Sequence, residues 1–370
     1  MSEPTQPLFL GLISGTSVDA IDAALVRFDS APQLIAARAM PYPAALRQRI
    51  LSVGLGSGQI TFQELGTLDV EIGRAFAAVA LDLLADSATP IDQVRAIGSH
   101  GQTVWHSPRT PIPFTIQLGD PNVIAELTGI DTVADFRRRD LAAGGEGAPL
   151  VPAFHAAFLQ DAGEDRAVLN LGGIANLSLL TKNRAVRGFD TGPANTLLDL
   201  WVQKHRGLPF DTDGAFAAAG NCQTQLLDRL LDEPYFAMAA PKSTGRDHFN
   251  TEWLERRIDG LTLSPEDVQA TLMILTARSI AMALKREAPG VRRLLVCGGG
   301  ARNQPMLAAI AAELDDVVVE RTDRYGLDTD FLEAMAFAWL ARETLAGRPG
   351  NLPVVTGARG PRLLGGIYRA

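Results

Sequence analysis

Two segments of the same pattern, each an apolar strand, a glycine turn and a second strand, lie about 160 residues apart in this 370-residue chain. The first reads Gly11-Leu-Ile-Ser-Gly-Thr-Ser and the second reads Leu169-Asn-Leu-Gly-Gly-Ile-Ala-Asn. Each opens a half in which apolar runs of strand length alternate with longer helical patterns, which is typical of α/β chains. Because a chain of this length usually exceeds what one hydrophobic core serves, we expect two related lobes facing each other across a cleft.

The expected strands fall in both halves of the chain. They are residues 9–13, 21–28, 95–99, 115–118 and 132–136 in the first half, and 167–171, 176–180, 184–189, 294–297 and 317–320 in the second. Glycines, arginines and a proline interrupt the regular pattern between about Ile130 and Pro152, and we expect the domain boundary there. The first lobe is then predicted over residues 1–132, with residues 357–370 able to rejoin it, and the second over residues 133–356.

Three helices carry clear signals of their own. Thr61-Phe-Gln-Glu64 is a capping box ahead of an amphipathic run, and Ser264-Pro265 supplies an N-cap followed by a proline at the first helical position. Phe331, Met335 and Trp339 define the apolar line of a third helix, and Glu333 lies off that line.

Charge, cysteine content and hydropathy exclude several classes of protein. The formal charge is −8 and the basic residues form no stripe, which argues against nucleic acid as a partner. Two cysteines without a C-x-x-C motif support neither a disulfide framework nor a zinc knuckle, and indicate a reducing, cytoplasmic compartment. No stretch approaches the roughly 18 apolar residues of a membrane span, so a membrane partner is not expected.

The first candidate site is the glycine turn that follows the first strand. Glycine permits a turn that exposes backbone N–H groups, and two hydroxyls beside it can donate to phosphate oxygens. The segment does not match a Walker A loop, because no G-K-[ST] occurs in the chain. An ordinary hairpin turn uses the same residue types, so both interpretations stay open. The segment consists of Gly15, Thr16, Ser17, Val18, Asp19, Ala20, Ile21 and Asp22.

A second candidate is Asp190, which follows an apolar strand in Phe189-Asp-Thr-Gly-Pro-Ala-Asn. An acid that leaves the carboxyl end of a strand lies where open α/β sheets bind ligands. Such a carboxylate suits a general base or a metal-linked acid. The alternative is that Asp190 only caps the following turn.

A third candidate is the run Cys297-Gly-Gly-Gly-Ala-Arg-Asn, where a buried strand meets three glycines before a helix from about Pro305. Glycines there let a flat ring or a phosphate approach the backbone. The spacing does not match the dinucleotide fingerprint G-x-G-x-x-G. A tight strand-to-helix turn is the alternative interpretation.

The fourth and fifth candidates are polar segments near strand ends in the first half. Gly98-Ser-His-Gly-Gln-Thr offers an imidazole and an amide that suit recognition of sugar hydroxyls. His100 and His106 are six apart, which matches neither helical nor strand spacing of zinc ligands. In Asp135-Phe-Arg-Arg-Arg-Asp, an arginine could clamp a carboxylate or phosphate through its planar fork, or only form local ion pairs.

Taken in order, these motifs resemble the acetate and sugar kinase, Hsp70 and actin superfamily, whose two RNase H-like lobes close on a nucleotide. Five segments carry the resemblance: Leu12-Ile-Ser-Gly-Thr-Ser-Val-Asp, Gly98-Ser-His-Gly-Gln-Thr, Asn170-Leu-Gly-Gly-Ile-Ala-Asn, Phe189-Asp-Thr-Gly-Pro-Ala-Asn and Cys297-Gly-Gly-Gly-Ala-Arg-Asn. Within that superfamily the ordered set looks like the anhydro-N-acetylmuramic acid kinase family, over nearly the whole chain. The implied fold is α/β with two actin-like ATPase lobes and an interlobe cleft.

The resemblance implies a cytoplasmic phosphotransferase of peptidoglycan recycling and amino-sugar catabolism. It would use ATP and water to open 1,6-anhydro-N-acetylmuramic acid and phosphorylate O6, giving N-acetylmuramic acid 6-phosphate and ADP. Asp190 matches the acid that activates the water, and Glu333 matches a helix acid that helps to hold it. The remaining implied roles are phosphate or nucleotide binding for Gly15 to Asp22, Gly172, Gly173, Asn176, Gly298, Gly299 and Gly300, and sugar binding for His100, Gln102, Arg137 and Asn195.

The resemblance also implies Mg²⁺ on the ATP phosphates and a homodimer. The superfamily's first loop reads D-x-G-T, whereas Ile13-Ser-Gly-Thr has an apolar residue at the acid position. The metal ligands are therefore not assigned, with Asp19, Asp22 and Asp190 all open.

Other functions remain as alternatives. A nucleotide-dependent clamp of the actin or Hsp70 type would use the same loops, and a kinase of another anhydrosugar would use the same site. A glycoside hydrolase could use Asp190 and Glu333 as a carboxylate pair, but it would not need three glycine loops.

Overall fold

The computed structural model describes residues 6–29, 31–54 and 60–370, which divide into two compact units. Unit 1 comprises residues up to Phe154 together with Gly326–Ala370, and unit 2 comprises His155–Tyr325. This division differs from the predicted boundaries of residues 132 and 133. Residues 326–356 lie in unit 1 because the helix that they contain packs against that unit's sheet.

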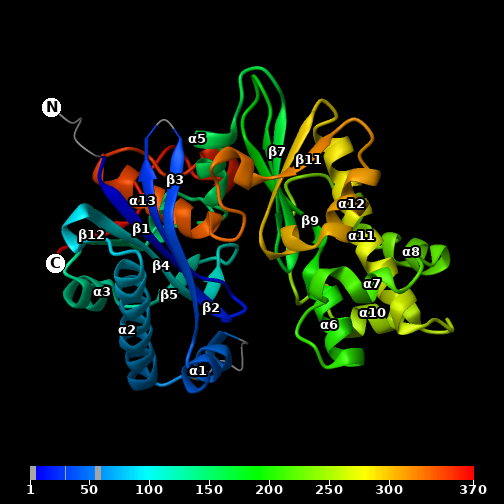
Figure 1. The fold of residues 1–370 in the computed structure, drawn as a ribbon, viewed down its shortest axis with the longest axis horizontal. Coiled ribbons are helices and arrows are strands. Elements are labelled where there is room, and N and C mark those ends of the chain that lie inside the picture. The colour runs from blue at the N-terminus through cyan, green and yellow to red at the C-terminus, as the bar shows by residue number, and fades with distance from the viewer. Residues whose placement is uncertain (1–5, 30, 55–59) are drawn as a thin grey trace. The chain divides into compact units, whose positions relative to one another are not determined.

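Unit 1 is built on a mixed sheet of order β12-β6-β4-β1-β2-β3, with β5 paired to β4 (Figure 1). β1 pairs antiparallel with β2 and parallel with β4, while β4 pairs parallel with β6. The C-terminal strand β12 pairs antiparallel with β6. The strands are β1 Leu8–Ser14, β2 Ala20–Phe28, β3 Pro32–Pro41, β4 Val94–Ser107, β5 Phe114–Leu118, β6 Thr132–Ala134 and β12 Gly366–Tyr368.

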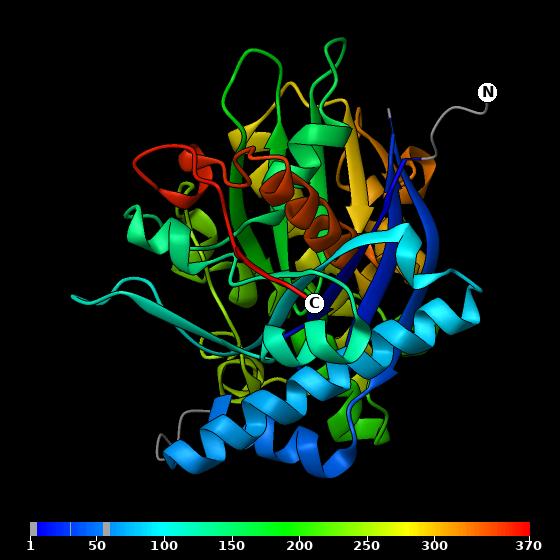
Figure 2. The same ribbon diagram turned by 90° about the vertical axis from the view of Figure 1, so that its left-hand side faces the viewer.

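Helices cover both faces of this sheet (Figure 2). α13 packs on β1, β2 and β4, and α2 contacts the same sheet as well as α3 and β5. Gly11 and Gly98 allow α13 its close approach, because a Cβ at either position would overlap a carbonyl oxygen of that helix. The helices of unit 1 are α1 Ala44–Gly54, α2 Phe62–Asp86, α3 Pro121–Thr128, α4 Arg138–Ala142, α13 Leu332–Leu345 and α14 Pro353–Thr356, with a 3₁₀ turn at Ile91–Gln93; α5, Val151–Leu159, spans the division.

Unit 2 repeats the central topology of unit 1. Its sheet has the order β11-β10-β7-β8-β9, with β7 antiparallel to β8, β8 antiparallel to β9, and β10 parallel to both β7 and β11. Both units thus carry a three-strand antiparallel meander extended by two parallel strands, which is the RNase H-like arrangement predicted from the sequence. The strands are β7 Arg166–Leu171, β8 Ile174–Leu180, β9 Arg187–Pro193, β10 Arg293–Cys297 and β11 Val318–Arg321.

The core of unit 2 is organised around α11, whose N-cap Ser264 accepts a hydrogen bond from the backbone N–H of Asp267 as its sequence predicts. Among the described residues α11 alone is long and apolar enough to cross a membrane, but 72% of its apolar stretch is buried in the structure. It is therefore best explained as a core helix. The helices of unit 2 are α6 Asn195–Arg206, α7 Ala215–Ala218, α8 Thr224–Leu231, α9 Pro234–Ala237, α10 Thr251–Ile258, α11 Pro265–Glu287 and α12 Gln304–Ala312, with 3₁₀ turns at Thr212–Gly214, Gly299–Arg302 and Thr322–Tyr325.

Candidate functional site

In unit 1, the first glycine loop (residues 15–19) connects β1 to β2. The backbone N–H of Val18 donates to the carbonyl oxygen of Gly15 at 3.1 Å, and Val18 adopts a positive φ of 56° while its side chain is buried. A β-branched residue in this conformation is strained, so the surrounding structure must hold it. The loop is therefore a fixed, compact turn whose remaining residues lead into β2.

Arg47 on α1 and Gln102 on β4 hold this loop. The guanidinium of Arg47 donates to the carbonyl oxygens of Val18 and Ser17 at 2.9 and 3.3 Å, and to the Asp19 carboxylate at 2.8 Å. The amide of Gln102 donates to the Gly15 carbonyl oxygen at 3.1 Å. Arg47 was not predicted as a site residue, because no motif near it in the sequence indicates that a helix arginine will bind the first loop. Gln102, expected near the sugar, contacts the first loop.

The carboxyl group of Asp22, at the start of β2, lies in an acidic environment. Burial, together with the neighbouring negative charges of Glu333 and Asp330, raises its pKa from 3.8 to about 6. Glu333 is in the first turn of α13, and Asp330 precedes that helix. Residues more than 300 positions apart in the sequence thus form one acidic group beside the first loop.

Arg137 supplies the positive charge that faces Glu333. It is buried, which lowers its pKa to about 10, while the charge of Glu333 acts in the opposite direction and favours the cation. Its guanidinium donates to the Gly147 carbonyl oxygen at 2.9 Å and to Nε2 of His100 at 2.9 Å. Arg137 is therefore a cation fixed in place by the protein.

Both ring nitrogens of His100 are engaged within unit 1. Nε2 accepts from Arg137, and Nδ1 lies 2.8 Å from the carbonyl oxygen of Gly101, to which it can donate in the neutral tautomer. Burial and the positive charge of Arg137 hold the histidine pKa well below its usual value, and its ring packs against Phe337. The sequence predicted a sugar contact for His100, whereas these contacts fit a residue that positions Arg137.

In unit 2, the second glycine loop (Gly172 and Gly173) connects β7 to β8. Its carbonyl oxygens accept hydrogen bonds from the first residues around α6: the N–H of Asn195 donates to Gly172 at 3.1 Å, and the N–H of Ala194 to Gly173 at 2.9 Å. A Cβ on Gly173 would lie 2.6 Å from the hydroxyl of Thr196. The loop is thus packed tightly against the start of α6 and needs glycine.

The third glycine loop (residues 298–300) follows β10 and meets the second loop through Leu171 and Asn195. Gly298 has a φ of +83°, and a Cβ there would overlap the Asn170 side chain. A Cβ on Gly300 would lie 2.8 Å from Cβ of Leu171 and 3.0 Å from the amide nitrogen of Asn195, which itself donates to the Leu171 carbonyl oxygen at 3.1 Å. Two glycine motifs far apart in sequence therefore converge on Asn195, which the sequence placed at the sugar.

Asp190 lies within β9 and pairs with Asn176 of β8. The sequence ended this strand at residue 189, but the structure continues it to Pro193, because Thr191 to Pro193 still pair or pack along β8. The backbone of Asp190 is therefore more fixed than that of a residue that caps a turn, because it lies inside a paired strand. The interpretation of Asp190 as a simple turn cap is thereby wrong.

The segment around Lys242 holds Asp190 from the other side. The backbone N–H of Thr244 donates to Oδ2 of Asp190 at 3.0 Å, and the N–H of Asp190 donates to the carbonyl oxygen of Lys242 at 3.0 Å. The hydroxyl of Tyr235 donates to the Asp190 carbonyl oxygen at 2.8 Å. The ammonium of Lys242 donates to the Tyr235 carbonyl oxygen at 2.9 Å and lies 4.3 Å from the centre of that ring. No sequence motif marked Lys242 or Tyr235.

These surroundings set the proton affinity of Asp190. Burial raises the pKa of Asp190, and the Thr244 N–H and the charge of Lys242 partly oppose that rise, so that the pKa is about 6 instead of the ordinary 3.8. Burial and the charge of Arg286 in turn lower the pKa of Lys242 to about 8. A carboxylate with a pKa of about 6 is mostly ionised at neutral pH and still basic enough to accept a proton, which is what a general base requires.

Comparisons with known proteins agree with this arrangement of motifs. Residues 7–370 match the family model described as anhydro-N-acetylmuramic acid kinase. The chain is 57% identical to the anhydro-N-acetylmuramic acid kinase of Xanthomonas campestris pv. campestris strain 8004, over 100% of both chains. It is 50% identical to the Pasteurella multocida protein of the same name, over 100% of this chain and 98% of that one.

Solved structures resemble the chain only distantly. An ROK family glucokinase from Streptomyces griseus in complex with glucose and AMPPNP aligns with 14% identity and a TM-score of 0.44, covering 91% of this chain and 99% of that one. The sequence matches over the full length decide the assignment: this chain belongs to the anhydro-N-acetylmuramic acid kinase family of phosphotransferases.

Proposed function

We propose that this chain opens 1,6-anhydro-N-acetylmuramic acid with water and transfers the γ-phosphoryl group of ATP to O6, giving N-acetylmuramic acid 6-phosphate and ADP. The observation that supports this most is the environment of Asp190. Its Oδ2 accepts the Thr244 N–H, and its carboxyl group has a pKa of about 6. Asp190 therefore combines a fixed geometry with a basicity suited to removing a proton from water at neutral pH.

The chemistry balances with one water per sugar. Water attacks the anomeric carbon as the bond from that carbon to O6 breaks, and Asp190 accepts the proton of the attacking water. The freed O6 attacks the γ-phosphorus, the bond to the β-phosphate bridging oxygen breaks, and ADP leaves. Such a transfer depends on positioning and on stabilisation of spreading charge more than on covalent catalysis by the protein.

Glu333 and Arg137 are the unit 1 residues that we assign to the sugar and its water. Glu333 opens α13, and its negative charge acts on both Asp22 and Arg137. Arg137 cannot move freely, because His100 and the Gly147 carbonyl oxygen fix its guanidinium. We propose that Glu333 orients the water and that Arg137 donates to oxygen atoms of the sugar.

The glycine loops are proposed to bind ATP. Backbone N–H groups of tight glycine turns suit phosphate oxygens, and the first loop also offers Thr16 and Ser17 hydroxyls. Unit 2 adds the second and third loops, which adjoin at Asn195. The N–H of Asn195 is used inside the protein, so a ligand contact by this residue would come through its side chain.

Mg²⁺ is expected to arrive bound to the ATP phosphates, where it would neutralise their charge. Among the described residues no group of three or more His, Cys, Asp or Glu side chains could hold a metal ion. The described side chains therefore form no all-protein magnesium cage. Mg²⁺ usually keeps several waters and binds one or two carboxylates together with phosphate oxygens, and we propose that mode of binding here. We further propose that the chain forms a homodimer and acts in the cytoplasm. Because the proposed substrate is a cell-wall amino sugar, we propose that the reaction belongs to the recycling of peptidoglycan.

The test is ADP release by the purified protein with Mg-ATP, with and without 1,6-anhydro-N-acetylmuramic acid, while the sugar is followed by mass. Sugar-dependent ADP release with a gain of one phosphate and one water is the expected result. Phosphate gain without water would remove the hydrolytic step, and ADP release that ignores the sugar would favour a nucleotide-driven clamp. Turnover only with a different anhydrosugar would keep the reaction and change the substrate.

A further inference from the structure

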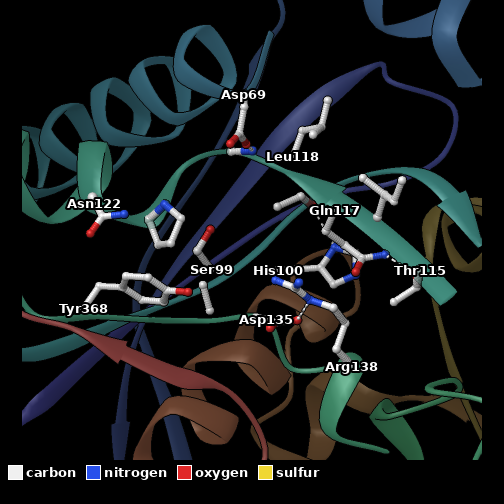
Figure 3. A pocket seen from close by; sticks show the side chains of 15 residues that line it. Asp69, Ser99, His100, Thr115, Gln117, Leu118, Asn122, Asp135, Arg138 and Tyr368 are labelled. Carbon is white, nitrogen blue, oxygen red and sulfur yellow. Dashed lines mark hydrogen bonds and ion pairs between the residues drawn. The ribbon is translucent and has the colours of Figure 1, made fainter. Parts of the chain in front are cut away.

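Unit 1 contains a cavity of about 290 Å³ whose lining includes none of Asp190, Glu333 and Arg137, the residues assigned above to the kinase chemistry (Figure 3). It lies among β4, β5, β6, α2, α3 and the C-terminal strand β12. Its size is near the lower end of the roughly 300–1,000 Å³ typical of small-molecule pockets, which fits a single ring. The polar side chains around it are Asp69, Ser99, His100, Thr115, Gln117, Asn122, Asp135, Arg138 and Tyr368, and His100 is the one that also contacts Arg137.

The cavity is on the face of the sheet opposite α13. A Cβ on Gly98 would overlap the Phe337 carbonyl oxygen, so position 98 of β4 faces α13. Successive residues of a strand face opposite sides, so the next residue, Ser99, faces α2 and α3. Figure 3 shows its hydroxyl in the middle of the cavity, with Asp69 and Tyr368 directed toward the same space. Glu333, on α13, belongs to the other face.

The Ser99 hydroxyl is the observation that points to a ligand. Ser99 is 1% exposed, and its Oγ has no hydrogen-bond partner within the protein. A buried hydroxyl without a partner costs folding free energy, whereas alanine at the same place would not. A polar ligand in the cavity would satisfy it.

The other groups define what such a ligand must offer. Asp69 uses Oδ1 to accept the Gly119 N–H at 2.7 Å, and Gln117 uses its amide nitrogen as a donor to Thr103 and Thr115. The second oxygen of Asp69 and the amide oxygen of Gln117 are therefore acceptors available to the cavity. A site rich in acceptors and hydroxyls selects a ligand that carries several O–H donors.

The charges around the cavity disfavour an anionic ligand. The guanidinium of Arg138 is paired with Asp135 at 2.8 Å, which leaves Asp69 as the unbalanced charge among the lining residues. The Tyr368 ring at the edge adds an apolar face on which the C–H groups of a ring can lie. We propose that this cavity is a second binding site, distinct from the kinase site, for a small neutral polyhydroxylated ring of pyranose or cyclitol size.

The experiment measures binding of D-glucose, N-acetyl-D-glucosamine and myo-inositol to the full chain by titration calorimetry, with D-glucose 6-phosphate as the anionic probe. We expect saturable binding of at least one neutral probe and none of the phosphate. Ser99→Ala should weaken that binding about fivefold to tenfold, as expected for one hydrogen bond. Asp69→Asn keeps an oxygen for the Gly119 N–H and should weaken binding by about tenfold or more, because the charged acceptor is lost.

Thermal unfolding separates a binding role of Ser99 from a structural one. Ser99→Ala should leave the midpoint unchanged or raise it, since no protein hydrogen bond is lost. The matched control is Thr132→Val on neighbouring β6, because Thr132 is also buried but donates to the Ile130 carbonyl oxygen at 3.3 Å. That variant should lower the midpoint and leave probe binding intact.

Two results would overturn the proposal. One is the absence of saturable binding by all three neutral probes. The other is binding that survives Ser99→Ala but is lost in Glu333→Gln, since the sugar would then occupy the kinase site. Neither readout requires turnover, so a failure of the proposed kinase reaction leaves the outcome distinguishable.

Discussion

The two units share one sheet topology but differ in what surrounds their central hairpins. The β1–β2 turn of unit 1 is the five-residue first loop, clamped by Arg47 and Gln102, whereas the β7–β8 turn of unit 2 has only Gly172 and Gly173 between the strands. Both turns place glycine at the end of an apolar strand. The repeated fold therefore supplies the loop position, and the added side chains decide what each loop contacts.

The buried acid of each unit makes the same point. Asp22 and Asp190 both have a pKa raised to about 6 by burial. Asp22 is beside the negative charges of Glu333 and Asp330, whereas Asp190 is beside the Thr244 N–H and the Lys242 ammonium. Burial is thus the main cause of both raised pKa values, but the neighbouring groups act in opposite directions. The Thr244 N–H and the Lys242 ammonium stabilise the ionised carboxylate of Asp190 and hold it in one position, so we expect Asp190 to be the better general base.

The largest expected effect is that of Asp190→Asn. Turnover should fall by about 10³-fold or more, in line with the loss of a general base, while the fold and ATP binding are retained. Steady-state kinetics together with ATP titration and circular dichroism would measure this. Near-normal turnover would show that Asp190 is not the general base, and the proposed difference in function between Asp22 and Asp190 would then be wrong.

Glu333→Gln should reduce turnover by about 10²-fold, if one hydrogen-bonding charge to the reacting water is lost. It should also lower the pKa of Asp22 from about 6, because a negative neighbour is removed. Carboxyl carbon chemical shifts followed against pH would report Asp22 and Asp190 separately. A pKa of Asp22 that does not change would contradict the acidic group described in unit 1.

Lys242→Met should move the acid limb of the pH profile of kcat/KM upward. The ammonium lowers the pKa of Asp190, so its loss raises that pKa above about 6 and reduces the ionised fraction at neutral pH. Activity at pH 7 should fall about twofold if that pKa rises by about one unit, and it should recover at higher pH. Lys204→Met, which breaks the surface ion pair with Glu255, is the matched control. An unshifted limb would exclude Lys242 as a positioning residue.

The smallest expected effect concerns stability and Asp22→Asn. The pKa of Asp22 is about 6 in the folded protein against 3.8 for the ordinary group, so Asp22 destabilises the fold progressively as pH rises from about 4 to 6 and by a constant amount above that. At about 1.4 kcal/mol per pKa unit, removing the charge should add up to about 3 kcal/mol to the free energy of unfolding at pH 8 and less than about 1 kcal/mol at pH 4. Urea unfolding at both pH values measures this.

A gain in stability that is equal at pH 4 and pH 8 would contradict the assignment of a raised pKa to Asp22. Asp82→Asn on the partly exposed face of α2 is the control for the loss of one acidic charge.

Local patterns predicted most of the elements. The ten expected strands are all present, and the Thr61 and Ser264 caps form as predicted, since the signals for them lie within a few residues. β3 was missed because it is an edge strand in which only Pro32 is buried, so its residues show no clear alternation of apolar and polar side chains. β12 was missed because three residues give no periodic signal.

The site could be predicted only in part. The glycine loops and Asp190 could be predicted because each directly follows an apolar run of strand length, where α/β sheets bind ligands. The contacts of His100 with Arg137 and of Lys242 with the Asp190 strand depend on tertiary packing between distant segments. The unit boundaries depend on packing too, because nothing in residues 332–345 tells a reader which sheet they will cover.

Unit 1 consists of two segments that lie on either side of unit 2 in the sequence, and this affects the order in which the units can fold during synthesis. Synthesis proceeds from the N-terminus, so the ribosome completes all of residues 155–325 before it adds α13, the helix that covers β1 and β4. During that interval the nascent sheet of unit 1 has one bare apolar face, while unit 2 is already a continuous folding unit. We expect that arrest of translation before residue 332 leaves unit 2 resistant to protease and unit 1 sensitive, and equal sensitivity of both would contradict this order of folding.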